Sequence, residues 1–292
     1  MESNEYIEQL LHLAKSPSIS SKELTASVQN LIRQTPLAFH KLDIPFIVRT
    51  CVLEPNEYCN HIYRCSFNPD CTKIPLQRCN YEKQQVFYGT IPGGMLNLSD
   101  AAQSAFLETC FDRIKDDPTF TNRFIVATRW NLKNSPYLWS LPFNEGSTEL
   151  NQHFKFLYSQ YDNILKESSL NEVEYNHNKA KARFISILFW TNENKKLVYR
   201  VTSTFFNEIC GLLNPLLPEK IDGLIYPSAN TKGEGMNIAL VKDFITEENI
   251  ECSHAVLYAY KRDPKNPKSI SFQPLENCTP SKDGEIEFKN YI

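Results

Sequence analysis

Glycine is scarce in this chain, with 9 among 292 residues, and long apolar runs are missing. The scarcity of glycine argues against a glycine-rich phosphate-binding loop, and no segment reaches the roughly 20 apolar residues that span a membrane. Residues 1–5 are acidic and polar, whereas a secretory signal starts basic and then turns apolar. We therefore expect a cytoplasmic protein without a membrane partner.

An excess of either charge is also missing, because 31 basic and 34 acidic residues leave a net charge of -3. Without a wide basic field, we expect no strong nucleic-acid binding. The sequence contains no G-x-S-x-G, G-x-x-x-x-G-K-[ST], H-E-x-x-H or G-x-G-x-x-G motif. Hydrolase and nucleoside-triphosphatase functions therefore lose most of their support. What is present, 41% hydrophobic and 22% charged residues, is typical of a globular protein.

The nine cysteines contain no C-x-x-C pair. Five of them share a short stretch with His61: Cys51, Cys59, Cys65, Cys71 and Cys79. Their wide spacing is poor for a tetrahedral zinc site, and cytoplasmic cysteines are normally reduced. We expect free thiols and no metal. A metal-binding interaction module with stoichiometric zinc is the less favoured alternative.

Apolar spacing predicts two helices near the N-terminus. The first covers residues 7–14, and the second begins at Ser20 and ends before Pro36, with Leu24, Val28, Leu31 and Ile32 facing inward. We expect residues 1–44 to form a helical extension and residues 45–292 to form the main domain. The extension is either a separate partner-binding module or a cover on one side of that domain.

Short strands and helices follow without regular alternation, which favours an α+β fold over a doubly wound sheet. Strands are expected at residues 46–53, 85–89, 124–130, 223–226, 237–241 and 252–260. Helices are expected after a cap at Ser99 or Asp100 and at residues 153–165, 179–190 and 197–210, the last closed by Gly211.

Several polar residues stand at the ends of apolar segments or on a helix. Arg49 follows F-I-V, Arg78 opens an R-C-N turn, Tyr88 ends V-F-Y, Glu108 lies in A-F-L-E, and Ser228 ends D-G-L-I-Y-P-S. The segment N-I-A-L follows at residues 237–240. In these residues the sequence resembles the RES-domain family, named for its Arg, Glu and Ser. The resemblance spans about residues 45–245, and D-G-L-I-Y-P-S is its most specific element.

The resemblance implies an ADP-ribosyltransferase-like fold, with a mixed β core and flanking helices. It also implies an enzyme that consumes NAD as a substrate by cleaving the nicotinamide-ribose bond. The activity would be that of an NAD glycohydrolase, a phosphorylase or an ADP-ribosyltransferase. Characterised relatives include toxins of Xre-RES toxin-antitoxin pairs, so a bacterial toxin or defence effector is expected. The implied partners are NAD, a separate antitoxin protein and a protein acceptor of ADP-ribose.

This reaction suits the residues that carry the resemblance. Nicotinamide leaves as a neutral molecule, so a single carboxylate, Glu108, suffices to stabilise the oxocarbenium-like transition state. The guanidinium groups of Arg49 and Arg78 would bind the pyrophosphate, and Tyr88 would offer its ring to the cationic nicotinamide. Ser228 and Asn237 would position ribose or phosphate. Within this set, Glu108, Arg49 and Ser228 are the expected catalytic residues.

Two alternatives stay open from the sequence. In the first, Glu108 is not catalytic and is an ordinary surface residue of an amphipathic helix. In the second, the whole chain is a catalytically inactive RES-like module that binds a nucleotide or a partner. The sequence does not distinguish water, phosphate and a protein side chain as acceptors of ADP-ribose.

Overall fold

The computed structural model describes residues 21–68, 70–91, 98–141, 152–192, 194–231, 235–263, 266 and 270–289. The helix expected at residues 7–14 lies outside these residues. Five α-helices are present in the described part: α2 (Ser21–Arg33), α3 (Leu98–Asp116), α5 (Gln152–Ser168), α6 (Glu172–Trp190) and α7 (Lys195–Glu208). None of them combines the length and the apolar character needed to cross a bilayer.

Nine strands form one mixed sheet in the order β1-β5-β6-β7-β3-β2-β4-β8-β9. Their bounds are β1 (Ala38–Lys41), β2 (Phe46–Leu53), β3 (Val86–Ile91), β4 (Asn122–Leu132), β5 (Tyr137–Ser140), β6 (Gly223–Pro227), β7 (Met236–Val241), β8 (Ile250–Arg262) and β9 (Ile270–Cys278). Every neighbouring pair is antiparallel except β5 and β6, which are joined through α5, α6 and α7. The fold is therefore α+β, as the sequence predicts.

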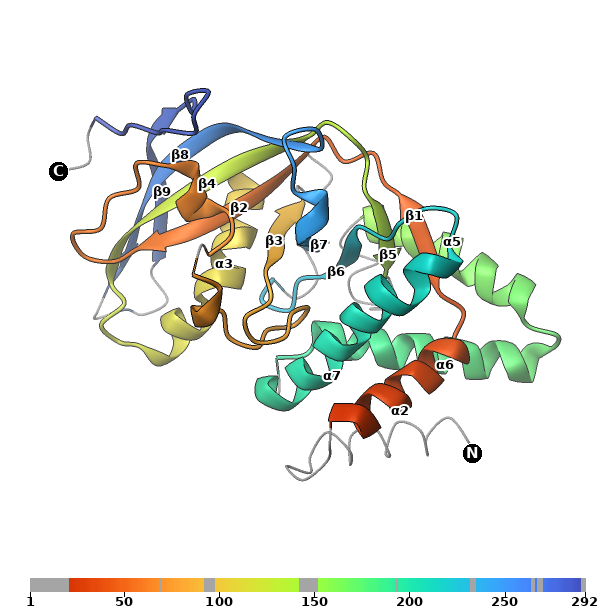
Figure 1. The fold of residues 1–292 in the computed structure, drawn as a ribbon. Coiled ribbons are helices and arrows are strands. Elements are labelled where there is room, and N and C mark those ends of the chain that lie inside the picture. The colour runs from red at the N-terminus through yellow and green to blue at the C-terminus, as the bar shows by residue number, and fades with distance from the viewer. Residues whose placement is uncertain are drawn as a thin grey trace.

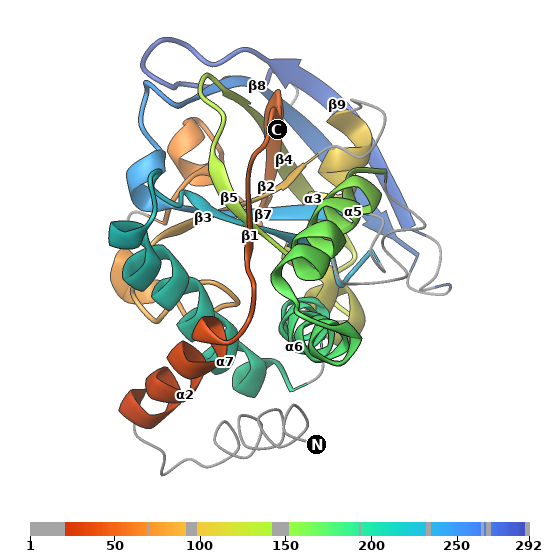
Figure 2. The same cartoon turned by 90° about the vertical axis from the view of Figure 1, so that its right-hand side faces the viewer.

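The helices divide between the two halves of the sheet (Figure 1). Helix α3 packs on β2 through small side chains, Ala101, Ala102 and Ala105, which allow a close approach to Val48 and Val52. Helices α2, α6 and α7 enclose a second core against β6 and β7. Figure 2 shows α5 and α6 together on one side of β1, with α7 on the other.

Residues 21–44 share the core and the sheet of the main domain. Leu24, Val28, Leu31 and Ile32 are all buried, as their spacing predicts, and they pack in one cluster with Phe205 of α7. Strand β1 pairs with β5 at the edge of the sheet. In the described part, residues 21–44 thus pack against residues of the main domain.

Several element boundaries differ from the prediction. Strand β2 has the expected bounds, whereas α3 begins at Leu98, so Ser99 and Asp100 lie inside the helix. Gly211 does not close α7, because a π-helical turn, Ile209–Leu213, continues the chain past it. The prediction missed β1, β5 and β9. The first two span four residues each, and β9 is a largely exposed edge strand that contains Pro274.

Candidate functional site

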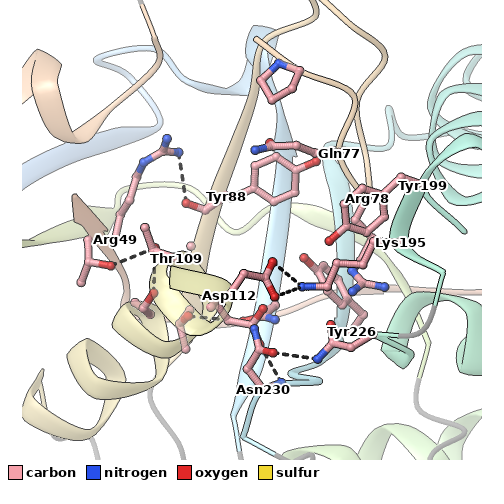
Figure 3. Close-up of a pocket in the computed structure, with 18 of the residues that line it drawn as sticks. Arg49, Gln77, Arg78, Tyr88, Thr109, Asp112, Lys195, Tyr199, Tyr226 and Asn230 are labelled. Atoms are coloured by element: carbon pink, nitrogen blue, oxygen red, sulfur yellow. Dashed lines mark hydrogen bonds and ion pairs between the residues drawn. The ribbon is translucent and has the colours of Figure 1, made fainter. Parts of the chain in front are cut away.

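A cavity of about 460 Å³ opens where the two halves of the sheet meet (Figure 3). Helix α3 forms one wall, the start of α7 forms the opposite wall, and β2 and β3 form the floor. Its volume lies within the usual range for small-molecule sites, about 300 to 1,000 Å³. Five residues that the sequence singles out line it: Arg49, Arg78, Tyr88, Glu108 and Asn237.

The carboxylate of Glu108 is held by the segment that follows β6. The hydroxyl of Ser228 donates a hydrogen bond to Oε1 of Glu108, and the backbone N–H of Asn230 donates to the same oxygen at 3.3 Å. Ser228 is fully buried, so its hydroxyl is fixed behind the carboxylate. Among the described residues, no donor is bonded to Oε2, which leaves this oxygen available to a ligand.

Ser228 has a defined place because its own surroundings are hydrogen-bonded. Its backbone N–H donates to the carbonyl of Gly235 at 2.9 Å, and its Oγ accepts from the N–H of Thr231 at 3.1 Å. The hydroxyl proton therefore points to Glu108. Ser228 orients the carboxylate in this arrangement, and among the described residues its hydroxyl has no histidine partner of the kind that activates a serine nucleophile.

Arg49 connects β2 to β3 at the floor of the cavity. Its Nη1 donates to the carbonyl oxygen of Tyr88 at 3.1 Å, and its guanidinium lies 5.0 Å from the ring centre of Phe87. A guanidinium has five N–H donors, and this contact uses one of them. Burial lowers the pKa of Arg49 from its ordinary value, yet arginine keeps its charge in proteins. The site thus contains a partly buried cation with donors to spare.

Arg78 is the most buried cation of the cavity, with 7% of its surface exposed. Its Nη1 donates to the carbonyl of Leu188 at 3.1 Å and its Nη2 to that of Thr191 at 3.2 Å, both at the C-terminal end of α6. Positive charge is favourable at a helix C-terminus, so Arg78 stabilises α6 as well as lining the cavity. Its guanidinium lies 5.2 Å from the ring centre of Tyr199 on α7.

Tyr88, in the middle of β3, joins this strand to the R-C-N turn. Its hydroxyl donates to Oδ1 of Asn80 at 2.9 Å and accepts from the N–H of Cys79 at 2.8 Å. Burial raises the pKa of Tyr88 well above its ordinary value, so the phenol stays neutral at physiological pH. The turn is thereby fixed against the strand, with the ring of Tyr88 exposed to the cavity (Figure 3).

Asn237 lies at the back of the cavity on β7. It pairs with Thr90 across the β3–β7 ladder, and Oγ1 of Thr90 donates to its Oδ1 at 3.3 Å. Both residues are nearly fully buried. The side-chain amide N–H₂ of Asn237 is a donor that a ligand hydroxyl or phosphate can accept.

Several residues of the cavity were missed by the sequence analysis. Nζ of Lys195 on α7 lies 2.6 Å from both carboxylate oxygens of Asp112 on α3, so this ion pair bridges the mouth between the two helices. Asn192 donates to Oδ1 of Asn230 at 2.7 Å. Tyr199 and Tyr226 add two aromatic side chains. Asp112 follows Glu108 by one helical turn, and this i,i+4 spacing was the one available signal.

The charged and aromatic residues of the cavity favour an anionic ligand that also carries a cationic or electron-poor ring. Three cations, Arg49, Arg78 and Lys195, stand against two carboxylates, Glu108 and Asp112. Donors that carry positive charge form the strongest hydrogen bonds to phosphate oxygens. Three tyrosines offer ring faces to a planar group. The structure thus brings the six sequence-predicted residues together, five around the cavity and Ser228 behind Glu108.

The comparisons with known proteins add no family to this geometry. A scan against protein-family models and a search of curated proteins both find no significant match to the chain.

Proposed function

We propose that this protein is an enzyme that cleaves the nicotinamide-ribose bond of NAD, and that its sheet is a variant of the ADP-ribosyltransferase-like core. One observation carries the proposal. Residues that match the RES pattern in the sequence, although spread over 189 positions from Arg49 to Asn237, gather around one cavity and contact one another in pairs. The pairs are Arg49 with Tyr88 and Glu108 with Ser228.

The reaction needs few groups, and each has a candidate here. The bond between C1′ of the ribose and N1 of nicotinamide breaks, and its electron pair passes to the pyridinium nitrogen, which becomes neutral. Positive charge develops on the ribose, and the Glu108 carboxylate stabilises it while Oε2 accepts a ribose hydroxyl. An acceptor then forms the new bond at C1′ and releases its proton. Ser228 keeps the carboxylate in place during both steps.

Binding of the dinucleotide follows from the remaining groups. The free donors of Arg49 bind the pyrophosphate, and Arg78 contributes the donors that the carbonyls of α6 do not use. The nicotinamide ring packs against Tyr88, with an attraction of about 0.5 to 2 kcal/mol for a cationic ring. Asn237 positions a hydroxyl or phosphate oxygen at the back of the cavity.

The test is incubation of the purified protein with NAD, followed by chromatography of nicotinamide and mass analysis of the ADP-ribose product. Separate reactions contain buffer alone, inorganic phosphate and a cell lysate as a source of protein acceptors. Release of nicotinamide supports the proposal, and the product mass identifies the acceptor. Absence of nicotinamide release in all three reactions contradicts it.

A binding module without turnover is the second candidate. The observation that favours it is the double engagement of Arg78 by backbone carbonyls, which gives this arginine a structural purpose. This candidate predicts that NAD binds, as measured by calorimetry, while no nicotinamide is released. An antitoxin partner and a toxic effect belong to the first candidate, and expression that lowers cellular NAD and stops growth would support them.

A further inference from the structure

Three of the nine cysteines gather at one buried point near Arg49. Cys51 lies on β2, Cys59 lies in the segment after it, and Cys65 ends the 3₁₀ turn Ile62–Cys65. Their sulfur atoms all lie within 4.8 Å of one another, and all three residues are buried. Cys71 and Cys79 do not belong to the group. All nine cysteines are free thiols, as the sequence predicts, and the fold brings these three together despite their wide spacing in the chain.

We propose that Cys51, Cys59 and Cys65 bind one thiophilic metal ion, Zn²⁺ or Cu⁺. The assignment is independent of the proposed function.

The backbone around the three sulfurs is held in place without a metal. Arg64 donates from Nη2 to the carbonyl of Val52 at 3.1 Å and forms an ion pair with Glu57 at 2.5 Å. The N–H of Ile62 donates to the carbonyl of Gly284, and the N–H of Ile286 donates to that of Asn60, both within 3.0 Å. The loop between Cys51 and Cys65 is thus attached to β2 on one side and to the C-terminal segment on the other.

The sulfur spacing is close to that of a metal-thiolate site. Thiolates about 2.3 Å from one ion stand roughly 3.8 Å apart at a tetrahedral angle. The sulfurs of Cys51 and Cys65 are 2.9 Å apart, and Cys59 lies within 4.8 Å of both. Opening the first pair by roughly 1 Å would suffice to admit an ion with Zn–S bonds of about 2.3 Å.

Charge also suits a thiolate site. Arg49 and Arg64 both interact electrostatically with Cys51 and Cys65. Three thiolates and a divalent ion leave one negative charge, or two with Cu⁺, and the two guanidinium groups offset it. Soft thiolate ligands select Zn²⁺ and Cu⁺ over Mg²⁺ and Ca²⁺.

His61 is not a ligand in this arrangement. Its Nδ1 accepts from the N–H of Tyr63 at 3.1 Å, and its Nε2 bonds the carbonyl of Asp283 at 2.7 Å. Among the described residues, no fourth Cys, His or carboxylate joins the group. The site is therefore a three-thiolate site, whose remaining coordination position is vacant or taken by a small exogenous ligand.

The test is elemental analysis of the purified full-length protein, loaded separately with Zn²⁺ and with Cu⁺ under reducing, anaerobic conditions and then freed of excess metal. We expect about one ion per chain. Cys59→Ser and Cys65→Ser should lower this content to background, whereas Cys71→Ser, at an exposed cysteine outside the group, should not change it. The near-ultraviolet circular dichroism of each variant shows whether it is folded.

A second measurement does not depend on the variants. Co²⁺ added to the metal-free protein should give the intense thiolate-to-cobalt absorption of a multi-thiolate site, and Zn²⁺ should bleach it. Three results would overturn the assignment: substoichiometric metal in both loading reactions, metal content unchanged in folded Cys59→Ser protein, or an unreduced protein about two daltons lighter, which means a disulfide in place of the thiols.

Discussion

Replacement of Glu108 by Gln is the most informative single change in the cavity. Glutamine has the size and shape of glutamate, and its carbonyl oxygen can accept the hydrogen bonds that Ser228 and Asn230 now give to Oε1. A hydrogen bond to a charged group contributes about 1.5 to 3 kcal/mol and a neutral one about 0.5 to 1.5 kcal/mol. Loss of the charge over these two bonds should therefore lower the free energy of unfolding by about 1 to 3 kcal/mol, which leaves most molecules folded.

The effect on catalysis should be much larger than the effect on folding. The carboxylate faces the charge that develops only in the transition state, so its loss should lower kcat about 100- to 1,000-fold and leave KM for NAD nearly unchanged. The assay is nicotinamide release at several NAD concentrations, with urea unfolding of the same protein. Asp116→Asn is the matched control, because Asp116 is an exposed carboxylate at the end of the same helix and does not line the cavity. Unchanged kcat in Glu108→Gln, or an equal loss in both variants, would show that Glu108 does not stabilise the transition state.

Three further predictions concern binding and stability. Arg49→Lys should raise KM for NAD about 10- to 100-fold with a smaller change in kcat. Lysine lacks the planar guanidinium, and one charge-assisted hydrogen bond contributes about 1.5 to 3 kcal/mol. Steady-state kinetics measures both constants, and an unchanged KM contradicts the prediction. Leu31→Ala should lower the free energy of unfolding in urea by about 2 to 5 kcal/mol, because Leu31 is 1% exposed, whereas Leu170→Ala, at a residue 92% exposed, should change it by less than about 0.5 kcal/mol. Equal effects would mean that α2 is not part of the core. Gly223→Ala should lower the free energy of unfolding by about 1 to 3 kcal/mol or more, because its Cβ would stand 2.1 Å from the carbonyl oxygen of Ala239. Gly211→Ala should be neutral or stabilising, because its Cβ meets nothing within 4 Å. Thermal unfolding compares the two variants.

The glycine of D-G-L-I-Y-P-S illustrates what the sequence motif encodes. Gly223 pairs with Leu240 across the β6–β7 ladder, and the backbone of β7 comes so close that no side chain fits. Asp222 accepts from the N–H of Tyr137 at 2.9 Å and so connects the start of β6 to β5. Ser228, at the other end, holds Glu108. The motif thus positions a strand and orients a carboxylate, and both functions depend on contacts with distant parts of the chain.

Local patterns predicted the elements better than their boundaries. The inward face of α2 follows from the helical spacing of its apolar residues, and β2 follows from a run of β-branched and apolar residues that contains one charged residue, Arg49. The start of α3 was placed too late, because Ser99 and Asp100 are good capping residues that here occupy the first helical turn. Short strands such as β5 are defined by their partners and not by their own sequence, so they were missed.

The sequence predicted which residues belong to the site from their type and motif. The structure adds the residues that these side chains contact, which no local pattern indicates. Arg78 follows the pattern of a ligand-binding residue, yet it also caps α6, which lies 110 positions away in the chain. Lys195, Tyr199 and Asn192 come from a helix and a connection whose sequences carry no recognisable motif. The cysteine cluster could not be predicted for the same reason. Cys51, Cys59 and Cys65 are far apart in the sequence, and only the fold brings their sulfur atoms together.

The central claim is that one dinucleotide occupies this cavity with its ribose at Glu108. The most direct measurement is a crystal structure of the Glu108→Gln protein with NAD, because this variant should bind the substrate and turn it over slowly. We expect the pyrophosphate beside Arg49, the nicotinamide ring against Tyr88, and C1′ of its ribose facing residue 108. A cavity that stays empty at saturating NAD, or a dinucleotide bound elsewhere on the protein, would contradict it.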